Sequence, residues 1–380
     1  MADHLIYSYS LCIALPLMLF FGFTFLFGKV PDKEIYANYL RSRRIMGIAV
    51  LLLAANYSVH FFFNLRFINV NAAILMNLTT YFLCYWLFSS ALTTLLDRFY
   101  ITRRRLTFHL SMWGIFSFLA WVVLLLVPNG FAQKIELFVL AVWLVAYGLF
   151  LAVRLLLTYR RATKIFANTH ADDIGAYIKW MRKFTYWALG FGVCCGLLTF
   201  LPDRYVYIWI LSSVPFYIYL YACYRNYYLF YEMVETVIES EITSEDDILG
   251  DKDLTAVSVE DVATPAPAHY GDVAQKIEAW IKEEGFRSQG LTIKELADTL
   301  YTNRTYLSSY INNECNATFR DWIASLRLDY AKRRMIEFPD QKLLEISEAS
   351  GFMSISHFMK LFKDREGLSP AKWRKLNTGR

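Results

Sequence analysis

The sequence predicts an all-α protein in two parts: a seven-helix transmembrane bundle, then a cytoplasmic all-helical domain with two helix-turn-helix subdomains. Of the 380 residues, 56% are hydrophobic and 17% are aromatic, which is too apolar for a soluble chain of this length. The apolar residues are also unevenly distributed, since long apolar runs stop near residue 231 and charged residues are dense after it. We therefore expect a membrane part over residues 1–231, a connection over 232–270 and a soluble part over 271–380.

Each predicted span is an apolar run long enough to cross about 30 Å of hydrocarbon, which takes roughly 20 helical residues. Backbone polar groups in lipid must be hydrogen-bonded within the segment, so each run is expected to be helical. The runs lie near residues 5–27, 45–65, 72–96, 106–127, 134–157, 184–201 and 206–230. The first run lacks a basic segment before it and is too long for a cleaved signal, so it is expected to stay as a span.

Basic residues in the short loops predict the orientation. One side carries 15 Lys and Arg residues, whereas the other side carries three. The larger set comprises Lys29, Lys33, Arg41, Arg43, Arg44, Arg98, Arg103, Arg104, Arg105, Arg160, Arg161, Lys164, Lys179, Arg182 and Lys183; the smaller comprises Arg66, Lys134 and Arg204. Because basic loops stay inside, we expect a multi-pass protein of the inner (cytoplasmic) membrane, with its N-terminus outside and its C-terminal domain in the cytoplasm.

The outer loops are too short for a folded sensor domain, so a signal would be read by the bundle or by a membrane partner. Candidate sensing residues are the polar stripe of Asn56, His60 and Asn64 and the tyrosine stripe of Tyr217, Tyr221 and Tyr224. The alternative is that both stripes pack helix against helix. One histidine with two asparagines is a poor ligand set, and the cysteines show no C-x-x-C spacing, so we expect no metal and no cofactor.

The connection begins with an apolar helical face at Met233, Val234, Val237, Ile238 and Ile242. A seam this short makes pairing into a homodimer a hypothesis, and a helix lying on the bilayer is the alternative. Residues 232–261 contain 11 acidic residues and one lysine, a net charge of −10, and TPAPAH follows at 264–269. This composition predicts a disordered acidic tether over 243–270.

Two short helical stretches near the C-terminus are separated by Gly351, a residue that can take the positive φ of a tight reversal. Apolar residues from Leu343 begin the first stretch, and Ser354 is expected to cap the second, where Phe358 and Phe362 recur at helical spacing. Polar and basic residues occupy its other face. The pattern predicts a helix-turn-helix whose second helix fits a DNA major groove, although a helical hairpin inside a globular domain looks similar.

An earlier helix pair has the same design. Thr292 and Glu295 form a T-x-x-E capping box, and RTYLSSYI follows the turn at 301–303. Thr318 is then expected to cap a longer helix that Pro339 ends. Its roughly 20 residues would span about 30 Å, close to the roughly 34 Å of one DNA turn.

Spaced elements of this region resemble AraC/XylS-type transcription regulators. They are GF at 351–352, FK at 362–363, G-x-S-P at 367–370, WR at 373–374 and W-I-x-x-x-R-L-x-x-A from Trp322 to Ala331. The resemblance covers about residues 272–376. It departs from the usual pattern at Asn316, where glycine is common, but asparagine also tolerates the left-handed conformation. The resemblance implies groove-facing positions at Arg304, Thr305, Ser308, Ser309, Ile355, Ser356, Met359 and Lys360.

Residue chemistry suggests a role for each of these positions. Lys360 suits guanine O6 and N7, Ser308 and Ser356 can bond either base type, and Ile355 and Met359 could touch thymine methyl groups. Phosphate contacts are expected from Lys363, Lys372 and Arg374. From residue 271 onward, 18 basic and 15 acidic residues give a net charge of +3, so nonspecific DNA affinity is expected to be moderate and salt-sensitive.

The combined interpretation is a membrane-embedded, one-component transcription regulator, not an enzyme. Its expected partners are double-stranded DNA and the lipid bilayer, with a small molecule or a membrane protein as the source of the signal. One alternative is a transporter or membrane enzyme with a regulatory DNA-binding appendage. Another is a bundle that serves only as an anchor.

Overall fold

The computed structural model describes residues 2–128, 130–172, 175–198, 200, 203–232, 234–235 and 270–378. Over these residues the chain is helical, and its only β-type pairing is one isolated bridge, so the predicted all-α fold is confirmed. The chain divides into two compact units, Met1–Arg161 with Ile178–Thr243, and Ala162–Tyr177 with Ser244–Arg380. The division does not follow the sequence order, because residues 162–177 belong to the second unit although they lie between two parts of the first.

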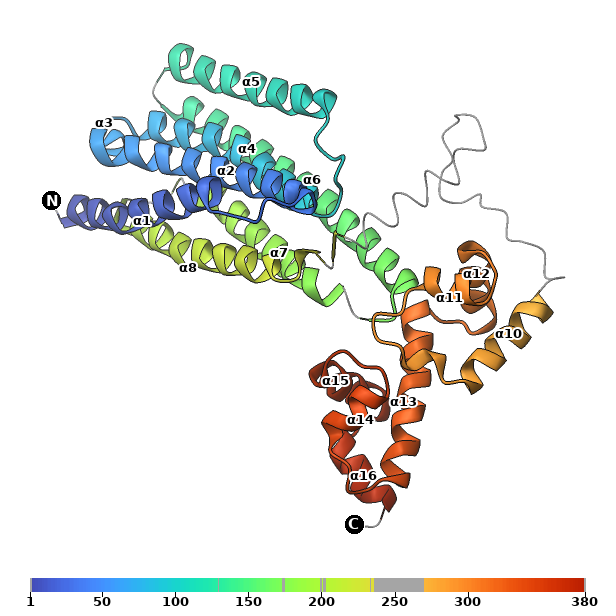
Figure 1. The fold of residues 1–380 in the computed structure, drawn as a ribbon. Helices are drawn as coiled ribbons and strands as arrows, with labels where there is room; N and C mark the ends of the chain where they lie inside the picture. Colours follow the sequence, from blue (N-terminus) through green and yellow to red (C-terminus); the bar gives the residue numbers. More distant parts are fainter. Residues whose placement is uncertain are drawn as a thin grey trace, which may run out of the picture. The chain divides into compact units, whose positions relative to one another are not determined.

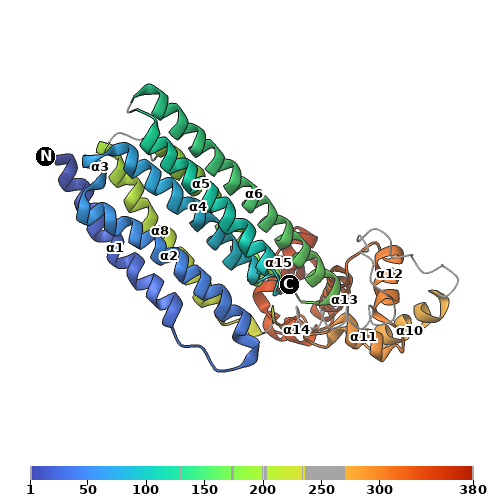
Figure 2. The same cartoon turned by 90° about the horizontal axis from the view of Figure 1, so that it is seen from above.

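The first unit is a bundle of long helices that run side by side (Figures 1 and 2). The helices are α1 Ala2–Phe27, α2 Ala37–Phe63, α4 Val70–Thr94, α5 Arg103–Leu126, α6 Phe131–Thr169 up to Arg161, α7 Gly175–Leu198 and α8 Asp203–Tyr228, with a short turn η1 Glu34–Tyr36 and a short helix α3 Leu65–Ile68. α1 packs between α2 and α8, and α4 packs between α2 and α5. Large apolar side chains such as Phe20, Trp121 and Leu125 are exposed on the outside of the bundle, which suggests association with a membrane.

Six of the described helices are long and apolar enough to cross a membrane: α1, α2, α4, α5, α6 and α8. α7 is not among them, because Lys179, Arg182 and Lys183 occupy its first half. The predicted run at 184–201 begins inside this helix. α6 is longer than predicted, since it continues to Thr169 rather than ending near residue 157. Seven crossings therefore stay a prediction that depends on α7.

A topology reporter tests that prediction. We expect alkaline phosphatase inserted after Phe200 to be active, because α7 would carry that point to the outer side. Insertions after Ala171 and after Thr378 should be inactive, because basic residues hold the flanking loops inside. The measurement is phosphatase activity per unit of fusion protein in whole cells.

An inactive Phe200 fusion together with an inactive Ala171 fusion would show that α7 does not cross the bilayer. The insertion after Thr378 is the independent control for the location of the C-terminal domain.

The second unit contains two small helical subdomains. Its helices are α10 Tyr270–Lys282, η3 Gly285–Arg287, α11 Ile293–Thr299, α12 Arg304–Glu314, α13 Phe319–Glu337, α14 Leu343–Ala349, α15 Ile355–Glu366 and α16 Pro370–Thr378. The first hydrophobic core joins α10, α11, α12 and the start of α13, whereas the second joins the end of α13 to α14, α15 and α16. α13 supplies Ile323 to the first core and Met335 to the second. Both subdomains are therefore built on one continuous helix.

The predicted connection lies largely outside the described residues. Met233, Val237, Ile238 and Ile242 fall there, as does the predicted tether up to residue 269. Val234 is described, and it is fully buried in the first unit. α10 begins at Tyr270, directly after these residues. The tether and the homodimer hypothesis stay predictions.

Candidate nucleic-acid interface

The first helix-turn-helix consists of α11 and α12. Its capping box forms as predicted: the Thr292 hydroxyl accepts a hydrogen bond from the Glu295 backbone N–H at 3.1 Å, and the Glu295 carboxylate accepts one from the Thr292 N–H at 2.9 Å. Asn303 caps α12 by accepting from the Tyr306 N–H at 2.7 Å. Leu307 and Ile311 on α12 are buried in the first core, so its opposite face is presented outward.

The second helix-turn-helix consists of α14 and α15. Gly351 has a φ of +87°, as the reversal requires, and Phe358 and Phe362 are fully buried. The expectation for Ser354 was wrong in one respect. Ser354 occupies the N-cap position of α15, but its side chain makes no capping hydrogen bond. Burial of the two phenylalanines, not a capped terminus, therefore anchors α15.

α13 joins the two motifs. Thr318 caps it by accepting from the Asp321 N–H at 3.2 Å, and the helix ends at Glu337, just before Pro339. Its 19 residues correspond to about 28 Å of helix at 1.5 Å per residue. Asn316, which precedes it, has a φ of 45°, so the asparagine takes the left-handed conformation that the sequence comparison left open.

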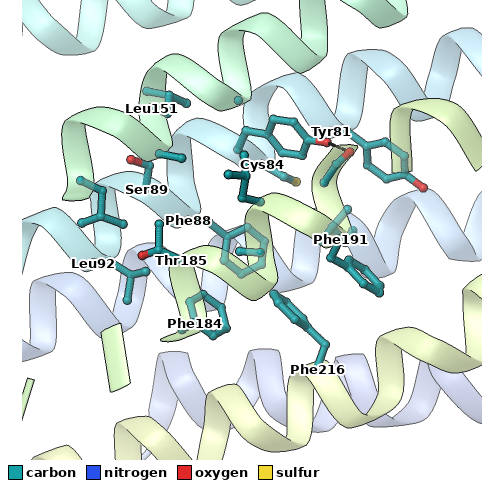
Figure 3. Close-up of a pocket in the computed structure, with 18 of the residues that line it drawn as sticks. Tyr81, Cys84, Phe88, Ser89, Leu92, Leu151, Phe184, Thr185, Phe191 and Phe216 are labelled. Carbon is teal, nitrogen blue, oxygen red and sulfur yellow. Dashed lines mark hydrogen bonds between the residues drawn. The ribbon is translucent and has the colours of Figure 1, made fainter. Parts of the chain in front are cut away.

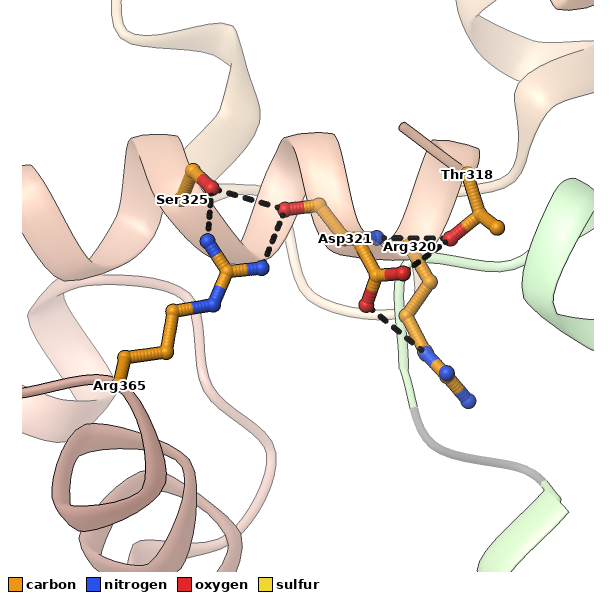
Figure 4. Close-up of polar contacts among 5 residues, drawn as sticks. All are labelled: Thr318, Arg320, Asp321, Ser325 and Arg365. Atoms are coloured by element: carbon orange, nitrogen blue, oxygen red, sulfur yellow. Dashed lines mark hydrogen bonds and ion pairs between the residues drawn. The ribbon is translucent and has the colours of Figure 1, made fainter. Parts of the chain in front are cut away.

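Polar contacts fix α15 against the start of α13 (Figure 4). The guanidinium group of Arg365 donates to the Ser325 hydroxyl and, at 3.1 Å, to the Asp321 backbone carbonyl. One residue further on, the Glu366 carboxylate lies 3.1 Å from the Lys332 ammonium group on α13. These contacts come from the C-terminal turn of α15, so they leave its N-terminal face exposed.

A second set of contacts joins the two subdomains through residues 286–290, which comprise the end of η3 and the loop after it and which we call the hub loop. Arg287 donates to the Ala349 carbonyl at 2.7 Å, and Gln289 donates to the Phe352 carbonyl at 3.3 Å. Gly351 lies against the same loop, because a Cβ atom placed on it would come within 2.5 Å of the Arg287 carbonyl oxygen. The hub loop thus contacts residues on both sides of the turn between α14 and α15.

Arg327 on α13 organises the hub loop. Its side chain is 1% exposed, and it donates to the carbonyls of Phe286 at 2.9 Å and Ser288 at 2.7 Å. A third bond, 3.1 Å long, goes to the carboxylate of Asp172, which lies in the segment after α6 and belongs to the same unit. Burial lowers the pKa of Arg327, and the Asp172 carboxylate raises it.

The structure places the predicted DNA-contact residues in two groups, one around α12 and one around α15 and α16. Those that are exposed are Thr305, Ser356, Lys360, Lys363 and Lys372. Those that are half-buried are Arg304, Ser308, Ser309, Ile355, Met359 and Arg374. Met359 packs partly against the second core, and Arg374 donates to the Gln341 carbonyl at 2.6 Å. These two side chains also have structural contacts, whereas Lys360 is presented outward.

The predicted polar stripe on α2 is directed at α4. Asn56 donates to the Asn77 side-chain carbonyl at 2.8 Å, and a ring nitrogen of His60 lies 2.9 Å from the same oxygen. Asn64 ends α2 in a left-handed conformation with a φ of 47°. Asn77, which the sequence analysis did not single out, therefore holds the stripe. The arrangement matches the packing alternative for Asn56 and His60.

The predicted tyrosine stripe on α8 faces three different surroundings. Tyr217 lines a cavity, Tyr221 packs against the rings of Phe21 and Phe25, and the buried Tyr224 hydroxyl lies 2.9 Å from the Ser42 hydroxyl. Only the first of the three therefore has access to space that a ligand could occupy.

The cavity lies among α2, α4, α6, α7 and α8 and has a volume of about 120 Å³ (Figure 3). Its walls are mostly apolar, with Phe88 of α4 and Phe184 and Phe191 of α7 among them. Polar side chains at its surface include Ser89 of α4 and Thr185 of α7. The sequence carried no signal for this cavity, because its lining comes from five helices that are separate in the chain.

The fold and the exposed helix faces define the C-terminal domain as a double helix-turn-helix domain. A family described as a helix-turn-helix domain matches residues 296–376. The uncharacterized HTH-type transcriptional regulator YobQ of Bacillus subtilis is 36% identical over 84 residues, which are 22% of this chain and 34% of that protein.

Two further regulatory proteins are also similar to part of this chain. The melibiose operon regulatory protein of Escherichia coli is 29% identical over 92 residues, or 24% of this chain and 30% of that protein. The transcriptional activator NphR of Rhodococcus is 29% identical over 93 residues, or 24% of this chain and 27% of that protein. The C-terminal domain is thus an AraC-type helix-turn-helix domain, as its motifs predicted. The chain spans about a third or less of the length of these relatives, and no solved structure matches it.

The contact of Gly351 with the hub loop yields a stability prediction. Gly351→Ala should destabilise α14 and α15 by roughly 2–4 kcal/mol, because it adds a positive-φ penalty to a clash with backbone. Gly367→Ala is the matched control. Its φ is +71° and no atom lies within 4 Å of the added methyl group, so only about 1 kcal/mol is expected.

The measurement is hydrogen exchange of residues 343–366 in both variants, which reports the free energy of local opening. Equal protection in the two variants would show that the Arg287 contact does not constrain the turn.

Proposed function

We propose that this chain is a membrane-embedded transcription regulator that binds specific DNA through α12 and α15 and responds to a signal received by its bundle. The observation that carries the proposal is the pair of helix-turn-helix motifs built on one continuous helix. α13 is about 28 Å long, and a helix of this length between the two motifs would suit two outward helix faces separated by about one DNA turn, roughly 34 Å. The names of the matched relatives as transcriptional regulators support the same function.

Membrane embedding is supported by the six helices that are long and apolar enough to cross a bilayer and by the exposed apolar side chains on their outer faces. The excess of basic residues in one set of loops supports a cytoplasmic location for the DNA-binding domain. A regulator built this way acts at the inner face of the membrane, so it binds chromosomal sites that approach that surface.

The exposed residues divide by chemistry into base contacts and phosphate contacts. Lys360 lies on the outward face of α15, and a lysine there can donate to guanine O6 and N7. Ser356 lies one turn earlier on the same helix, and Thr305 lies at the start of α12. Lys363 and Lys372 are exposed nearby and suit phosphate oxygens.

Lys360→Ala should weaken specific binding by roughly 1–3 kcal/mol, because one base contact is lost. The probe is the duplex that wild-type protein in nanodiscs enriches from a random-sequence pool, and the measurement is its Kd at fixed salt. Lys276→Ala on α10 is the control, since it removes the same charge from a helix outside both motifs. Equal effects of the two substitutions would show that only total charge matters and that Lys360 reads no base.

The cavity in the bundle suggests the class of signal. A cavity of about 120 Å³ is comparable to the roughly 150 Å³ apolar cavity that holds one benzene ring. Its apolar walls would exclude a charged molecule. The hydroxyl groups of Ser89 and Thr185 could orient one polar substituent. We therefore assign sensing to this cavity and to Tyr217, with a small uncharged aromatic or aliphatic molecule as the ligand.

Phenol is a suitable probe for this assignment. We expect phenol to raise the thermal midpoint of the full-length protein in nanodiscs, because a ligand that binds only the folded state stabilises it. Ala188→Phe fills the cavity from α7 and should abolish the shift. The control is Ala132→Phe, which adds the same ring at an exposed position of α6.

A phenol shift of the same size in wild type and Ala188→Phe would place the binding elsewhere, in the lipid or at another site. No shift in wild type up to millimolar phenol would argue against an aromatic ligand of this size.

A further inference from the structure

The segment that follows α6 is part of the DNA-binding unit, although it lies between two membrane helices in the sequence. Ala171 is 2% exposed and packs into the first hydrophobic core. Its backbone N–H donates to the Leu291 carbonyl at 3.0 Å, and His170 forms an antiparallel bridge with Thr292. The segment therefore adds a short strand-like edge beside the start of α11.

Asp172 extends the contact to the hub loop. One carboxylate oxygen lies 3.1 Å from a terminal nitrogen of Arg327, and the other accepts from the Gly290 N–H at 3.1 Å. The Asp172 side chain is only 12% exposed. A carboxylate with two partners in a nearly dry position makes a stronger bond than a surface ion pair, because solvent screens it little.

This carboxylate supplies the negative charge beside Arg327. The guanidinium group is 1% exposed, and the other acceptors that it contacts are the neutral carbonyls of Phe286 and Ser288. A buried cation that loses its counter-charge is strongly unfavourable, so the surrounding loop would have to open and admit water. That loop also carries Arg287 and Gln289, which hold the second helix-turn-helix.

We propose that residues 170–172, the docking segment, are the contact through which the membrane bundle controls the relative placement of the two DNA-reading helices. When the segment is docked, Asp172 neutralises Arg327, the hub loop is ordered, and α12 and α15 keep the separation that α13 sets. When α6 and α7 withdraw it, the hub loop loosens and the two helices no longer bind successive grooves together. This regulation rests on the proposed DNA-binding function, whereas the docking itself does not.

The effect of docking on DNA affinity can be distinguished from the nonspecific effect of a change in net charge. Asp172→Asn removes one negative charge, which by itself would strengthen attraction to DNA. The docking proposal predicts the opposite, a ten- to hundredfold loss of affinity for the enriched duplex at constant salt. Glu278→Gln on α10 makes the same charge change at an exposed site and should leave affinity unchanged or slightly higher.

Docking is tested directly by a disulfide. Because the hydrogen bond joins Ala171 to Leu291, His170 and Thr292 are a non-hydrogen-bonded pair, whose Cα atoms lie roughly 4.5 Å apart and suit a disulfide. The full-length protein carries His170→Cys and Thr292→Cys, with exposed Cys12 and Cys315 changed to serine. A protease site inserted after Thr255 then separates the DNA-binding domain from the bundle.

After oxidation with diamide, cleavage and denaturation in SDS, the DNA-binding domain should be retained in one band with the bundle, and reduction should separate the two fragments. The control pair, His170→Cys with Thr299→Cys, moves the second thiol to the other end of α11, roughly 10 Å along the helix, and should give separate fragments under both conditions. The oxidised, docked protein should bind the enriched duplex as tightly as wild type does.

Retention no greater than in the control pair would overturn the docking. Retention combined with wild-type affinity in Asp172→Asn, or with weakened affinity in the oxidised protein, would overturn the control of DNA binding. If the wild-type protein enriches no duplex from the pool, the proposed function fails, and the disulfide still decides whether the segment docks.

Discussion

The burial of Arg327 is the constraint on which the C-terminal domain depends. A guanidinium group that is 1% exposed needs its hydrogen bonds and a counter-charge within the protein, and these come from the hub loop and from Asp172. Because the same loop contacts Ala349 and Phe352, satisfying one buried cation also fixes the second helix-turn-helix. The two motifs are thus joined in two ways. α13 contributes residues to both hydrophobic cores, and the hub loop makes polar contacts with the second motif.

Hydrogen bonds between helices also constrain the bundle, which is the apolar part of the chain. Several polar groups inside it hydrogen-bond from one helix to another: Asn77 accepts from Asn56 and lies within hydrogen-bond distance of His60, and the Ser42 hydroxyl lies within hydrogen-bond distance of Tyr224. This is the behaviour expected where no water is available to hydrate them. A cavity lies among five helices of the bundle, and its mostly apolar walls include the hydroxyl groups of Ser89 and Thr185. The polar residues named as joining the helices are therefore different from the two hydroxyl-bearing residues named at the cavity.

Local features of the fold could be predicted from the sequence because they depend on neighbouring residues. The capping box at Thr292, the cap at Thr318 and the left-handed turns at Gly351 and Asn316 all form. The uncapped α15 is an exception, since packing of Phe358 and Phe362 removes the need for the Ser354 cap. The apolar runs likewise predicted the long apolar helices of the bundle, apart from the basic half of α7 and the extra length of α6.

Contacts between residues that are far apart in the sequence could not be predicted, because they leave no local sequence pattern. Asp172 lies 155 positions from Arg327, and a single aspartate in a loop looks like ordinary surface charge. The Arg365 contacts to α13 and the walls of the cavity depend in the same way on how helices pack. The family resemblance and helical periodicity could predict exposed residues of α12 and α15 such as Thr305, Ser356 and Lys360, but not the packing of Met359 against the second core.

The burial of Ala171 affects which residues must be kept when the DNA-binding domain is fused to another protein. Its methyl group fills a place in a core whose other members come from more than a hundred positions later in the chain. A chimera that joins this DNA-binding domain to a foreign anchor near residue 243 would lack that methyl group and leave the Leu291 carbonyl without its partner. The compact DNA-binding unit therefore includes the residues between α6 and α7, and it does not begin at the acidic stretch alone.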